Sequence, residues 1–360
     1  MAKTADYGLG EFTYPRGWFM VAQSAEVGTT PISVRYFGQD MVIYRGGQSG
    51  KPFMVEAYCP HMGTHLGRNT TSYVIKDAEH VEGDNIRCPY HGWRFGPDGK
   101  CNQIPYSPAP VPKAACIKSW KVIERAGCLW TWFDPEGLEP DYDLPAFDGY
   151  DAPHWVNWNV RELGVLNSHP QEVVDNMADK AHLEPVHGSI DIASFENEFS
   201  DHVCRQILSA GHKTLAAEGG EPMTNNTWYT GPGILQSEMI GANPSLMLIA
   251  HTPVDDGVLK VWYGLLVKVS NATPNDDDRA LAKAYEDAGV DAFAQDFEIW
   301  DNKRPCINPM MVRGDGPFDK VRVWYRQFYN PRAQAATFQQ RVNGRYTTRG
   351  TKVAPWDSAA

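Results

Sequence analysis

The sequence predicts an α+β protein in two parts: an all-β domain, then a domain in which helices lie on an antiparallel sheet. From Trp18 to about Phe133, short β-rich runs such as VIYR and FMVEAY alternate with turn signals such as GPDGK, without a sustained helical period. Residues 134–153, DPEGLEPDYDLPAFDGYDAP, are rich in Pro, Gly and Asp and are typical of a linker. After residue 153 the sequence contains both long apolar runs, typical of strands, and two segments with helical period. This combination predicts an α+β domain.

Two helices are expected in the second part. In residues 169–188, HPQEVVDNMADKAHLEPVHG, apolar side chains from Val173 to Ala181 have helical spacing, Pro170 suits the first turn and Pro185 suits the end. The second helix is expected from about Asp277 to Asn302. Strands are expected in the segments CRQILSAGHKTL, NNTWYTGPGILQSEMIG, SLMLIAHTPV and LKVWYGLLVKVS, and a closing strand in VRVWYRQFY, before a polar tail.

Composition excludes several classes of function. The chain has 360 residues, of which 42% are hydrophobic and 21% charged, as in soluble globular proteins. The formal net charge of -11, without a basic cluster, argues against nucleic-acid binding, because phosphate contacts need concentrated Lys and Arg. No run approaches 18 apolar residues and the N-terminus lacks a signal-peptide pattern, so we expect no membrane span and a cytoplasmic location.

The seven cysteines fall into two groups. Cys59 and Cys88 each have a histidine companion at close spacing. The others are expected to be small core residues rather than a disulfide framework, since the chain is long and shows no secretion signal. These five are Cys101, Cys116, Cys128, Cys204 and Cys306.

The first chemical motif pairs Cys59 with His61 and Cys88 with His91. Two thiolates and two imidazoles suit a tetrahedral zinc ion or a Rieske [2Fe-2S] cluster, in which two Cys bind one iron and two His the other. In a zinc finger the two histidines follow each other on a helix, whereas here each loop supplies one Cys and one His, which the cluster requires. A zinc-stabilised protein whose second part binds a lipid is the non-enzymatic alternative.

The second motif is expected on the first helix. Asp175, Asp179 and His182 fall at i, i+4 and i+7 and would share one helical face, with His187 shortly after. Two imidazoles and one carboxylate form the triad that holds non-haem Fe(II) and leaves positions open for O2. The alternative is an amphipathic helix with solvent-exposed Asp and His.

The carboxylate of that triad is expected on the second helix. Phe293, Phe297 and Trp300 form an apolar stripe, and Asp296 lies within it. A carboxylate beside a buried stripe is costly unless it is paired or bound to metal. Glu298 and Asp301 point elsewhere or lie nearer the helix end, so Asp296 is selected; the alternative is that the acidic residues of this helix form a solvated face.

These motifs resemble the Rieske non-haem iron oxygenases, in CPHMGTHL and CPYHGWRFGPDGKC for the all-β domain and in NMADKAHLEPVH for the first helix. The resemblance implies a helix-grip, START-like catalytic domain and a mononuclear Fe(II) on His182, His187 and Asp296. It also implies that Asp179 carries electrons between a cluster histidine of one subunit and an iron-bound histidine of the next, in a homotrimer. One departure is the 26 residues between His61 and Cys88, more than the family usually has. Within them TTSYVIKDAEHVEGDN, residues 70–85, is expected to be an extended hairpin that leaves the ligands in place.

Within the family, CNQIPYSPAPVPKAACIKSWKV and LWTWFDPEG resemble the branch of 3-ketosteroid 9α-hydroxylase oxygenase components and cholesterol 7-desaturases. The resemblance implies a terminal oxygenase component, a monooxygenase that hydroxylates a hydrophobic substrate, expected to be a steroid, with O2 and two electrons. Because the chain has no Gly-rich dinucleotide fingerprint, the electrons should come from a separate NAD(P)H-dependent reductase, with or without a ferredoxin. The alternative within the family is hydroxylation or O-demethylation of an aromatic acid, for which Arg205 is the candidate carboxylate partner.

The domain ranges that follow are 1–145 for the [2Fe-2S] domain, 146–345 for the catalytic domain and 346–360 for the tail. Apolar and aromatic side chains of the catalytic range could line a pocket for a hydrophobic ligand or form an ordinary sheet core. They include Trp228, Tyr229, Met239, Met247, Trp262, Tyr263 and Leu265.

Overall fold

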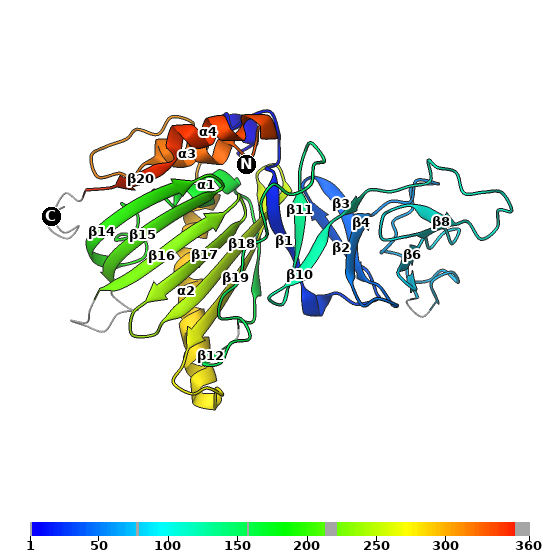
Figure 1. The fold of residues 1–360 in the computed structure, drawn as a ribbon, viewed down its shortest axis with the longest axis horizontal. Helices are drawn as coiled ribbons and strands as arrows, with labels where there is room; N and C mark the ends of the chain where they lie inside the picture. Colours follow the sequence, from blue (N-terminus) through cyan, green and yellow to red (C-terminus); the bar gives the residue numbers. More distant parts are fainter. Residues whose placement is uncertain (1, 77–78, 157, 213–221, 350–360) are drawn as a thin grey trace. The chain divides into compact units, whose positions relative to one another are not determined.

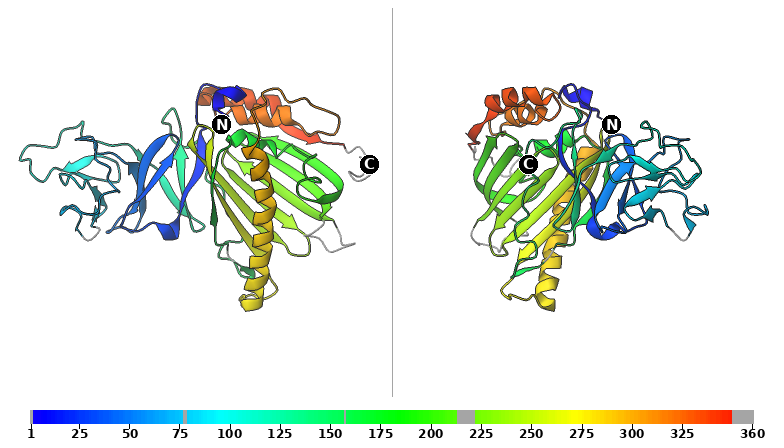
Figure 2. Two further views of the ribbon diagram at one scale, coloured as in Figure 1. Left: turned by 180° about the vertical axis from the view of Figure 1, so that it is seen from behind. Right: turned by 45° about the vertical axis from the view of Figure 1, so that its right-hand side comes forward.

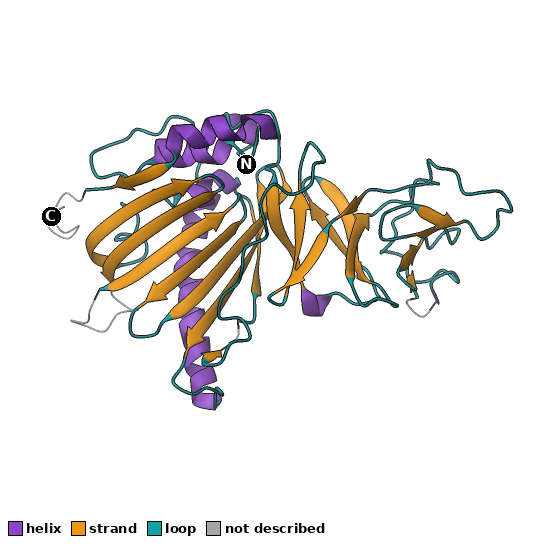
Figure 3. Ribbon diagram, in the orientation of Figure 1, coloured by secondary structure: helices purple, strands orange, loops and turns teal. Residues whose placement is uncertain are grey.

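A computed structural model describes residues 2–76, 79–156, 158–212 and 222–349 (Figures 1 and 3). The chain forms two compact units, which we describe separately. The all-β unit comprises Trp18–Pro140 and Thr252–Asp255, and the sheet unit comprises Met1–Gly17, Asp141–His251 and Asp256–Ala360. The predicted α+β class, an all-β domain followed by helices on an antiparallel sheet, is confirmed.

The first 17 residues differ from the expected domain ranges, because they belong to the sheet unit rather than to the all-β unit. Backbone N–H groups of Phe12 and Arg16 donate to the carbonyls of Tyr329 and Phe328. Leu9 is buried in the main core of that unit. These contacts join residues far apart in sequence, so local pattern could not reveal them.

The all-β unit contains three small antiparallel sheets, with strand orders β1-β11-β10, β2-β3-β4-β9 and β5-β6-β7-β8 within its described residues. The two predicted cluster loops follow β4 and β6. The strands are β1 (Gly17–Gln23), β2 (Ile32–Tyr36), β3 (Gln39–Arg45), β4 (Pro52–Glu56), β5 (Val81–Glu82), β6 (Asn85–Arg87), β7 (Arg94–Phe95), β8 (Cys101–Gln103), β9 (Ser119–Trp120), β10 (Val122–Arg125) and β11 (Cys128–Phe133).

The sheet unit is built on an antiparallel sheet of nine described strands, in the order β12-β19-β18-β17-β16-β15-β14-β20 with β13 beside β19. The long helix α2 (Asp276–Asp301) crosses one face of this sheet (Figure 2). The strands are β12 (Trp155–Val156), β13 (Arg161–Leu166), β14 (Ser189–Ser200), β15 (Val203–His212), β16 (Met223–Thr230), β17 (Ile234–Ile240), β18 (Ser245–Asp255), β19 (Val258–Lys268) and β20 (Gly344–Thr347). The other helices are α1 (Pro170–Asp175), α3 (Phe318–Arg326) and α4 (Ala335–Val342).

The strand register shows which side chains point to the same face of the sheet as α2. Cys204, Tyr229 and Leu235 lie directly opposite one another on β15, β16 and β17. Directly opposite residues of antiparallel strands point to the same face, and neighbours along a strand alternate. Tyr263 of β19 lies on the face that meets α2, since a Cβ at Gly289 of α2 would fall 2.1 Å from its hydroxyl. We call this the inner face.

The first predicted helix is shorter than expected. Helix α1 ends at Asp175, and residues 176–188 form turns, so Asp175, Asp179 and His182 do not share one helical face. Two carbonyls that a longer helix would use internally accept side-chain bonds from the sheet instead. Gln206 donates to the carbonyls of Asn176 and Met177, and Asn197 donates to Met177. Tertiary hydrogen bonds therefore outcompete helix propagation here.

The predicted closing strand VRVWYRQFY is wrong, because this segment lies in α3 and the turn after it. Its buried side chains Val321, Trp324, Tyr325 and Phe328 are spaced three or four residues apart, which is a helical period. The aromatic and β-branched composition of the segment favoured a strand, but the helical spacing of its apolar residues was the better guide to its structure. The expected tail, 346–360, begins within β20, and residues 350–360 lie outside the described residues.

Other expectations have mixed outcomes. The four predicted strand segments of the sheet are found, with NNTWYTGPGILQSEMIG divided into β16 and β17; residues 213–215 lie outside the described residues. Strand β14 was not predicted. Of the five expected core cysteines, Cys116 and Cys306 are exposed, whereas the other three are buried. Among the described helices, none combines the length and apolar character needed to span a membrane.

Candidate metal centres

The two predicted cluster loops share one backbone pattern. In each, the cysteine N–H donates to the carbonyl five residues on, and the residue four positions on donates back to the cysteine carbonyl. Gly63 and Gly92 occupy that returning position with φ of 71° and 74°, which favours glycine. The bonds are Cys59 N to Thr64 O, Gly63 N to Cys59 O, Cys88 N to Trp93 O and Gly92 N to Cys88 O.

The thiols of this pair of loops lie inside and the imidazoles lie towards the surface. Cys59 and Cys88 are 1% and 2% exposed, whereas His61 is exposed and His91 half-buried. The two imidazole rings are 4.7 Å apart, and the His61 ring stacks on Trp93 at 4.6 Å. One metal position would therefore be buried between sulfurs and a second would face solvent between imidazoles.

The spread of these four side chains tests a single zinc ion against a two-iron cluster. Around a tetrahedral zinc ion, ligand atoms lie about 4 Å or less from one another. Among the described residues, the one group of three or more candidate ligand atoms within 4.8 Å of each other is His182, His187 and Asp296. No three of the cluster-loop ligands are that close, which fits a cluster with thiolates and imidazoles on different irons.

Hydrogen bonds prepare one sulfur as a thiolate. The Cys59 thiol donates to the Cys88 sulfur, and the backbone N–H groups of Tyr90 and His91 add to that bond. Together they lower the pKa of Cys88 to about 6. Thiolate is the form that binds metal.

The second centre gathers three side chains from two parts of the sheet unit. His182 and His187 come from the turns after α1, and Asp296 comes from α2. Asp296 Oδ2 lies 3.3 Å from His187 Nε2, and the two imidazole centroids are 5.0 Å apart at 80°. The structure thus brings together all three residues predicted to hold iron.

Hydrogen bonds leave one nitrogen of each imidazole available. His182 Nδ1 is 2.6 Å from the Asp179 carbonyl oxygen, and His187 Nδ1 is 3.3 Å from Gln295 Oε1. Since both partners are acceptors, the Nδ1 atoms carry the protons and the Nε2 atoms keep free lone pairs. Two neutral imidazoles and a carboxylate fit Fe(II) with open positions.

Asp296 is held by a residue that the sequence analysis did not select. The Asp296 side chain is 6% exposed, and its Oδ2 accepts from Asn176 Nδ2 at 2.9 Å. This bond occupies one lone pair and directs the remaining ones towards the histidines. The signal was the position of Asn176 at the start of NMADKAHLEPVH, three residues before Asp179.

Asp179 lies beside the first histidine rather than in the ligand group. Its Oδ1 accepts from the His182 backbone N–H at 3.2 Å and lies 3.7 Å from His182 Nδ1. Burial raises the pKa of Asp179, but hydrogen bonding to His182 outweighs burial and holds that pKa below its usual range. The side chain remains 31% exposed, so one edge of the carboxylate is open to solvent.

Asp175, which was expected to share a helical face with Asp179 and His182, is buried and lies outside the ligand group. Its carboxylate pairs with Arg322, with the shortest contact 2.6 Å, and accepts from Gln171 Nε2 at 2.7 Å. Burial raises the pKa of Asp175, and the Arg322 guanidinium opposes that shift. Asp175 therefore anchors α1 to α3.

The sheet register separates the predicted pocket residues into two groups. Gln206, whose side-chain amide donates to the carbonyl of Asn176, marks the part of the inner face near the candidate iron ligands. Tyr229, Met239, Met247, Tyr263 and Leu265 share this face or pack against its core, whereas Trp228 and Trp262 lie on the other. Arg205, next to Gln206, also points to the other face, where it contacts Asn226 at 3.3 Å.

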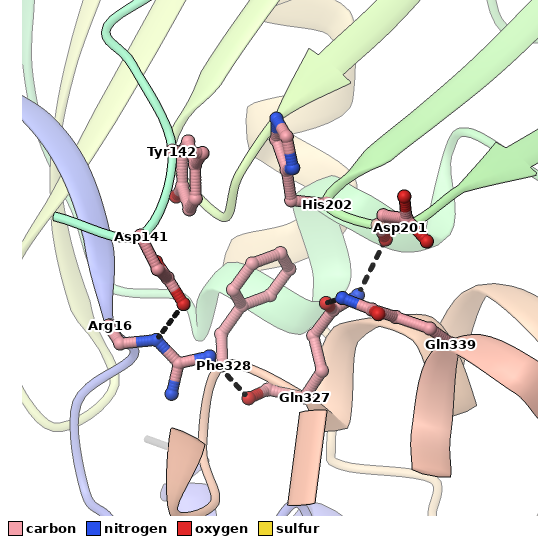
Figure 4. A pocket seen from close by; sticks show the side chains of 8 residues that line it. All are labelled: Arg16, Asp141, Tyr142, Asp201, His202, Gln327, Phe328 and Gln339. Atoms are coloured by element: carbon pink, nitrogen blue, oxygen red, sulfur yellow. Dashed lines mark hydrogen bonds and ion pairs between the residues drawn. The ribbon is translucent and has the colours of Figure 1, made fainter. Parts of the chain in front are cut away.

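A separate polar cavity of about 320 Å³ lies elsewhere in the sheet unit (Figure 4). Buried Arg16 pairs with Asp141 at 3.5 Å on one side, and the Tyr142 and His202 rings stack at 4.2 Å on another. None of the lining residues belongs to either candidate metal centre. They are Arg16, Asp141, Tyr142, Asp201, His202, Gln327, Phe328 and Gln339.

Comparison with known families assigns both halves of the chain. Residues 17–121 match the Rieske [2Fe-2S] domain, and residues 131–329 match the 3-ketosteroid 9alpha-hydroxylase C-terminal domain. The two matches cover the segments that carry the two candidate metal centres.

Similar proteins agree along most of the chain. A probable 3-ketosteroid-9-alpha-monooxygenase oxygenase component of Rhodococcus rhodochrous is 32% identical, over 91% of this chain and 83% of that protein. The cholesterol 7-desaturase of Xenopus laevis is 30% identical, over 91% and 74% of the two chains. Among solved structures, NdmA of Pseudomonas putida CBB5 with caffeine has a similar fold, with a TM-score of 0.69, 17% identity and coverage of 94% and 97%.

Proposed function

The chain belongs to the Rieske oxygenase family that includes the 3-ketosteroid 9α-hydroxylase oxygenase components, and on that premise we propose that it hydroxylates a steroid with O2. It is a monooxygenase oxygenase component with a Rieske [2Fe-2S] cluster and a mononuclear non-haem iron. In the proposal, Cys59, His61, Cys88 and His91 hold the cluster. His182, His187 and Asp296 hold the iron.

The main observation in support of the proposal is that ligand atoms of His182, His187 and Asp296 lie within 4.8 Å of one another. Both imidazoles keep Nε2 free because each Nδ1 has an acceptor, and Asp296 is oriented by Asn176. A carboxylate this buried needs a positive partner, which a divalent metal ion supplies.

In the proposed reaction, the bound cluster supplies single electrons and the bound iron activates O2. The overall balance takes one substrate C–H bond, O2, two electrons and two protons to one hydroxyl group and one water. The protein groups hold the geometry: the Asp179 carbonyl and the Gln295 side chain each accept from an Nδ1–H, which turns both imidazoles so that their Nε2 atoms would face the iron. Asn176 keeps the Asp296 carboxylate directed at the histidines.

A steroid fits the chemistry of the inner face better than an aromatic acid does. Apolar and aromatic side chains line that face beside the iron ligands, among them Met239, Met247 and Tyr263. Arg205, the candidate partner for a carboxylate, points to the opposite face of the sheet. The named 3-ketosteroid relatives give the same substrate class.

The proposal includes partners that a single chain does not contain. The electrons come from a separate NAD(P)H-dependent reductase, with or without a ferredoxin, as the name of an oxygenase component implies. Asp179 bridges its own His182 to a cluster histidine of a neighbouring subunit in a homotrimer, a role supported by its 31% exposed side chain. Such an enzyme would work in the cytoplasm.

The test is reconstitution of the purified chain with a Rieske-oxygenase reductase and NADH. We expect a coloured protein with iron and acid-labile sulfide, and hydroxylated product from a 3-ketosteroid. A panel of aromatic acids serves as the matched comparison. Product only from the acids would overturn the steroid assignment, and a colourless zinc protein would overturn the oxygenase.

A further inference from the structure

The described residues of the insert between the cluster loops, 70–76 and 79–85, form turns and one short hairpin instead of the expected extended hairpin. Only Val81–Arg87 pair as the hairpin strands β5 and β6, and the other described residues make turns. The Asn69 side chain accepts from the N–H groups of Thr71 and Ser72 at 3.2 and 3.0 Å. The His80 ring, 1% exposed, closes the segment with a 2.9 Å contact to the Asn69 carbonyl. Residues 77–78 of the expected hairpin lie outside the described residues.

The insert touches the second cluster loop through Ser72. Its hydroxyl oxygen accepts from the Val74 N–H at 3.1 Å, and the hydroxyl donates to the Pro89 carbonyl at 2.5 Å. The acceptor role fixes the oxygen, so the hydroxyl proton is directed at Pro89. Val74 also lies against this loop, since a Cβ at Gly92 would fall 3.6 Å from its side chain.

The Pro89 carbonyl belongs to the same peptide unit as the Tyr90 N–H, which donates to the Cys88 sulfur. Ser72, the Pro89–Tyr90 peptide and the Cys88 sulfur thus form one hydrogen-bonded chain. A donor on the carbonyl polarises the peptide and strengthens its N–H bond, by roughly 10–30% per bond in condensed phases. It also holds that peptide plane in one orientation.

We propose that Ser72 is a positioning residue for the Rieske cluster. The Ser72 hydroxyl raises the reduction potential of the cluster by strengthening the hydrogen bond from the Tyr90 N–H to the Cys88 sulfur. Reduction adds negative charge to the cluster, and hydrogen bonds to its sulfurs favour the more negative state. The inference rests on the proposed ligand role of Cys88. It gives the insert a function, namely to bring a hydroxyl group to the second cluster loop.

The test compares reduction potentials of the purified holoprotein by dye-equilibrated titration followed by EPR, without substrate or reductase. In Ser72→Ala the reduced-to-oxidised ratio at a fixed potential should fall about threefold, which is about 28 mV at 59 mV per tenfold for one electron. Ser72→Thr keeps the hydroxyl and should restore the wild-type potential. Thr71→Ala, an exposed neighbour in the same turn, is the matched control and should leave the potential unchanged.

The outcomes separate this inference from the proposed function. An unchanged potential in Ser72→Ala, with full cluster content, overturns the inference alone. An equal fall in Ser72→Thr or Thr71→Ala also overturns it, since the effect would then reflect packing rather than the hydroxyl. A chain that binds no cluster overturns the inference together with the proposed function.

Discussion

His187 Nε2 and Asp296 Oδ2 lie 3.3 Å apart, the imidazole on a turn that follows α1 and the carboxylate on α2. Neither group has a basic side chain as its charge partner in this contact. The Gln295 acceptor holds a proton on His187 Nδ1, so the proposed metal ion would lie between Nε2 and the buried Asp296 carboxylate and would balance the carboxylate charge.

Replacement of Asp296 by Ala should remove the mononuclear iron while the cluster remains. The protein should lose about one iron per chain, keep its acid-labile sulfide and lose substrate-dependent O2 consumption, because two neutral imidazoles alone bind Fe(II) poorly. Glu298→Ala is the matched control, since Glu298 is an exposed carboxylate of the same helix. Retention of iron in Asp296→Ala, by metal analysis, would remove Asp296 from the ligand set.

Asp179→Asn should leave both metal sites filled and slow electron delivery by at least about tenfold. The amide keeps an acceptor for the His182 backbone N–H but loses the negative charge beside the imidazole. The measurement is the rate of cluster reoxidation in a single turnover with substrate and O2. A wild-type rate in this variant would refute the bridging role.

Asn176→Ala should weaken iron binding without removing a ligand. Loss of the 2.9 Å bond to Asp296 frees the carboxylate to turn away from the histidines, and loss of such supporting bonds typically lowers metal affinity about 10–100-fold. Iron release to a chelator, followed with time, measures the effect. Asn308→Ala, at an exposed asparagine, should behave as wild type.

Arg322→Ala should destabilise the fold by about 3 kcal/mol, because it leaves the buried Asp175 carboxylate without its cation. The deficit should depend on pH with a definite sign. Burial raises the pKa of folded Asp175 and Arg322 opposes this, so the variant has a still higher folded pKa. Its stability is then retained at low pH, where Asp175 is protonated in both states, and lost as pH rises through the folded pKa.

Urea denaturation of the variant and wild type at several pH values between about 5 and 8 measures this deficit. Arg304→Ala, at an exposed arginine near the end of α2, is the control and should show little change. A deficit that is constant with pH would mean that Arg322 stabilises through packing rather than through its charge.

The candidate metal ligands could be selected from the sequence because most of them lie close together along the chain. Cys59 with His61, and Cys88 with His91, each lie in one short loop, and a turn suffices to bring both side chains of a pair to the same place. His182 and His187 are likewise close in sequence. Asp296 required one further argument, that a carboxylate within the stripe of Phe293 and Phe297 needs a partner.

The support around these ligands was not predictable in the same way. Asn176 and Gln206 are ordinary polar residues in sequence, and their roles exist only because a turn, a strand and α2 meet. The predicted length of the first helix was wrong for the same reason. Side chains of the sheet donate hydrogen bonds to a carbonyl that a longer helix would use internally.

By itself the sequence determined which side chains could bind metal, since ligand type and short spacing are local properties of the chain. The tertiary structure alone decided how those ligands are turned, with Asp296 brought to His187 and each Nδ1 given an acceptor. It also placed Ser72 against the second cluster loop. Orientation depends on hydrogen bonds between segments distant along the chain, and such bonds form only when the competing local structure is less stable.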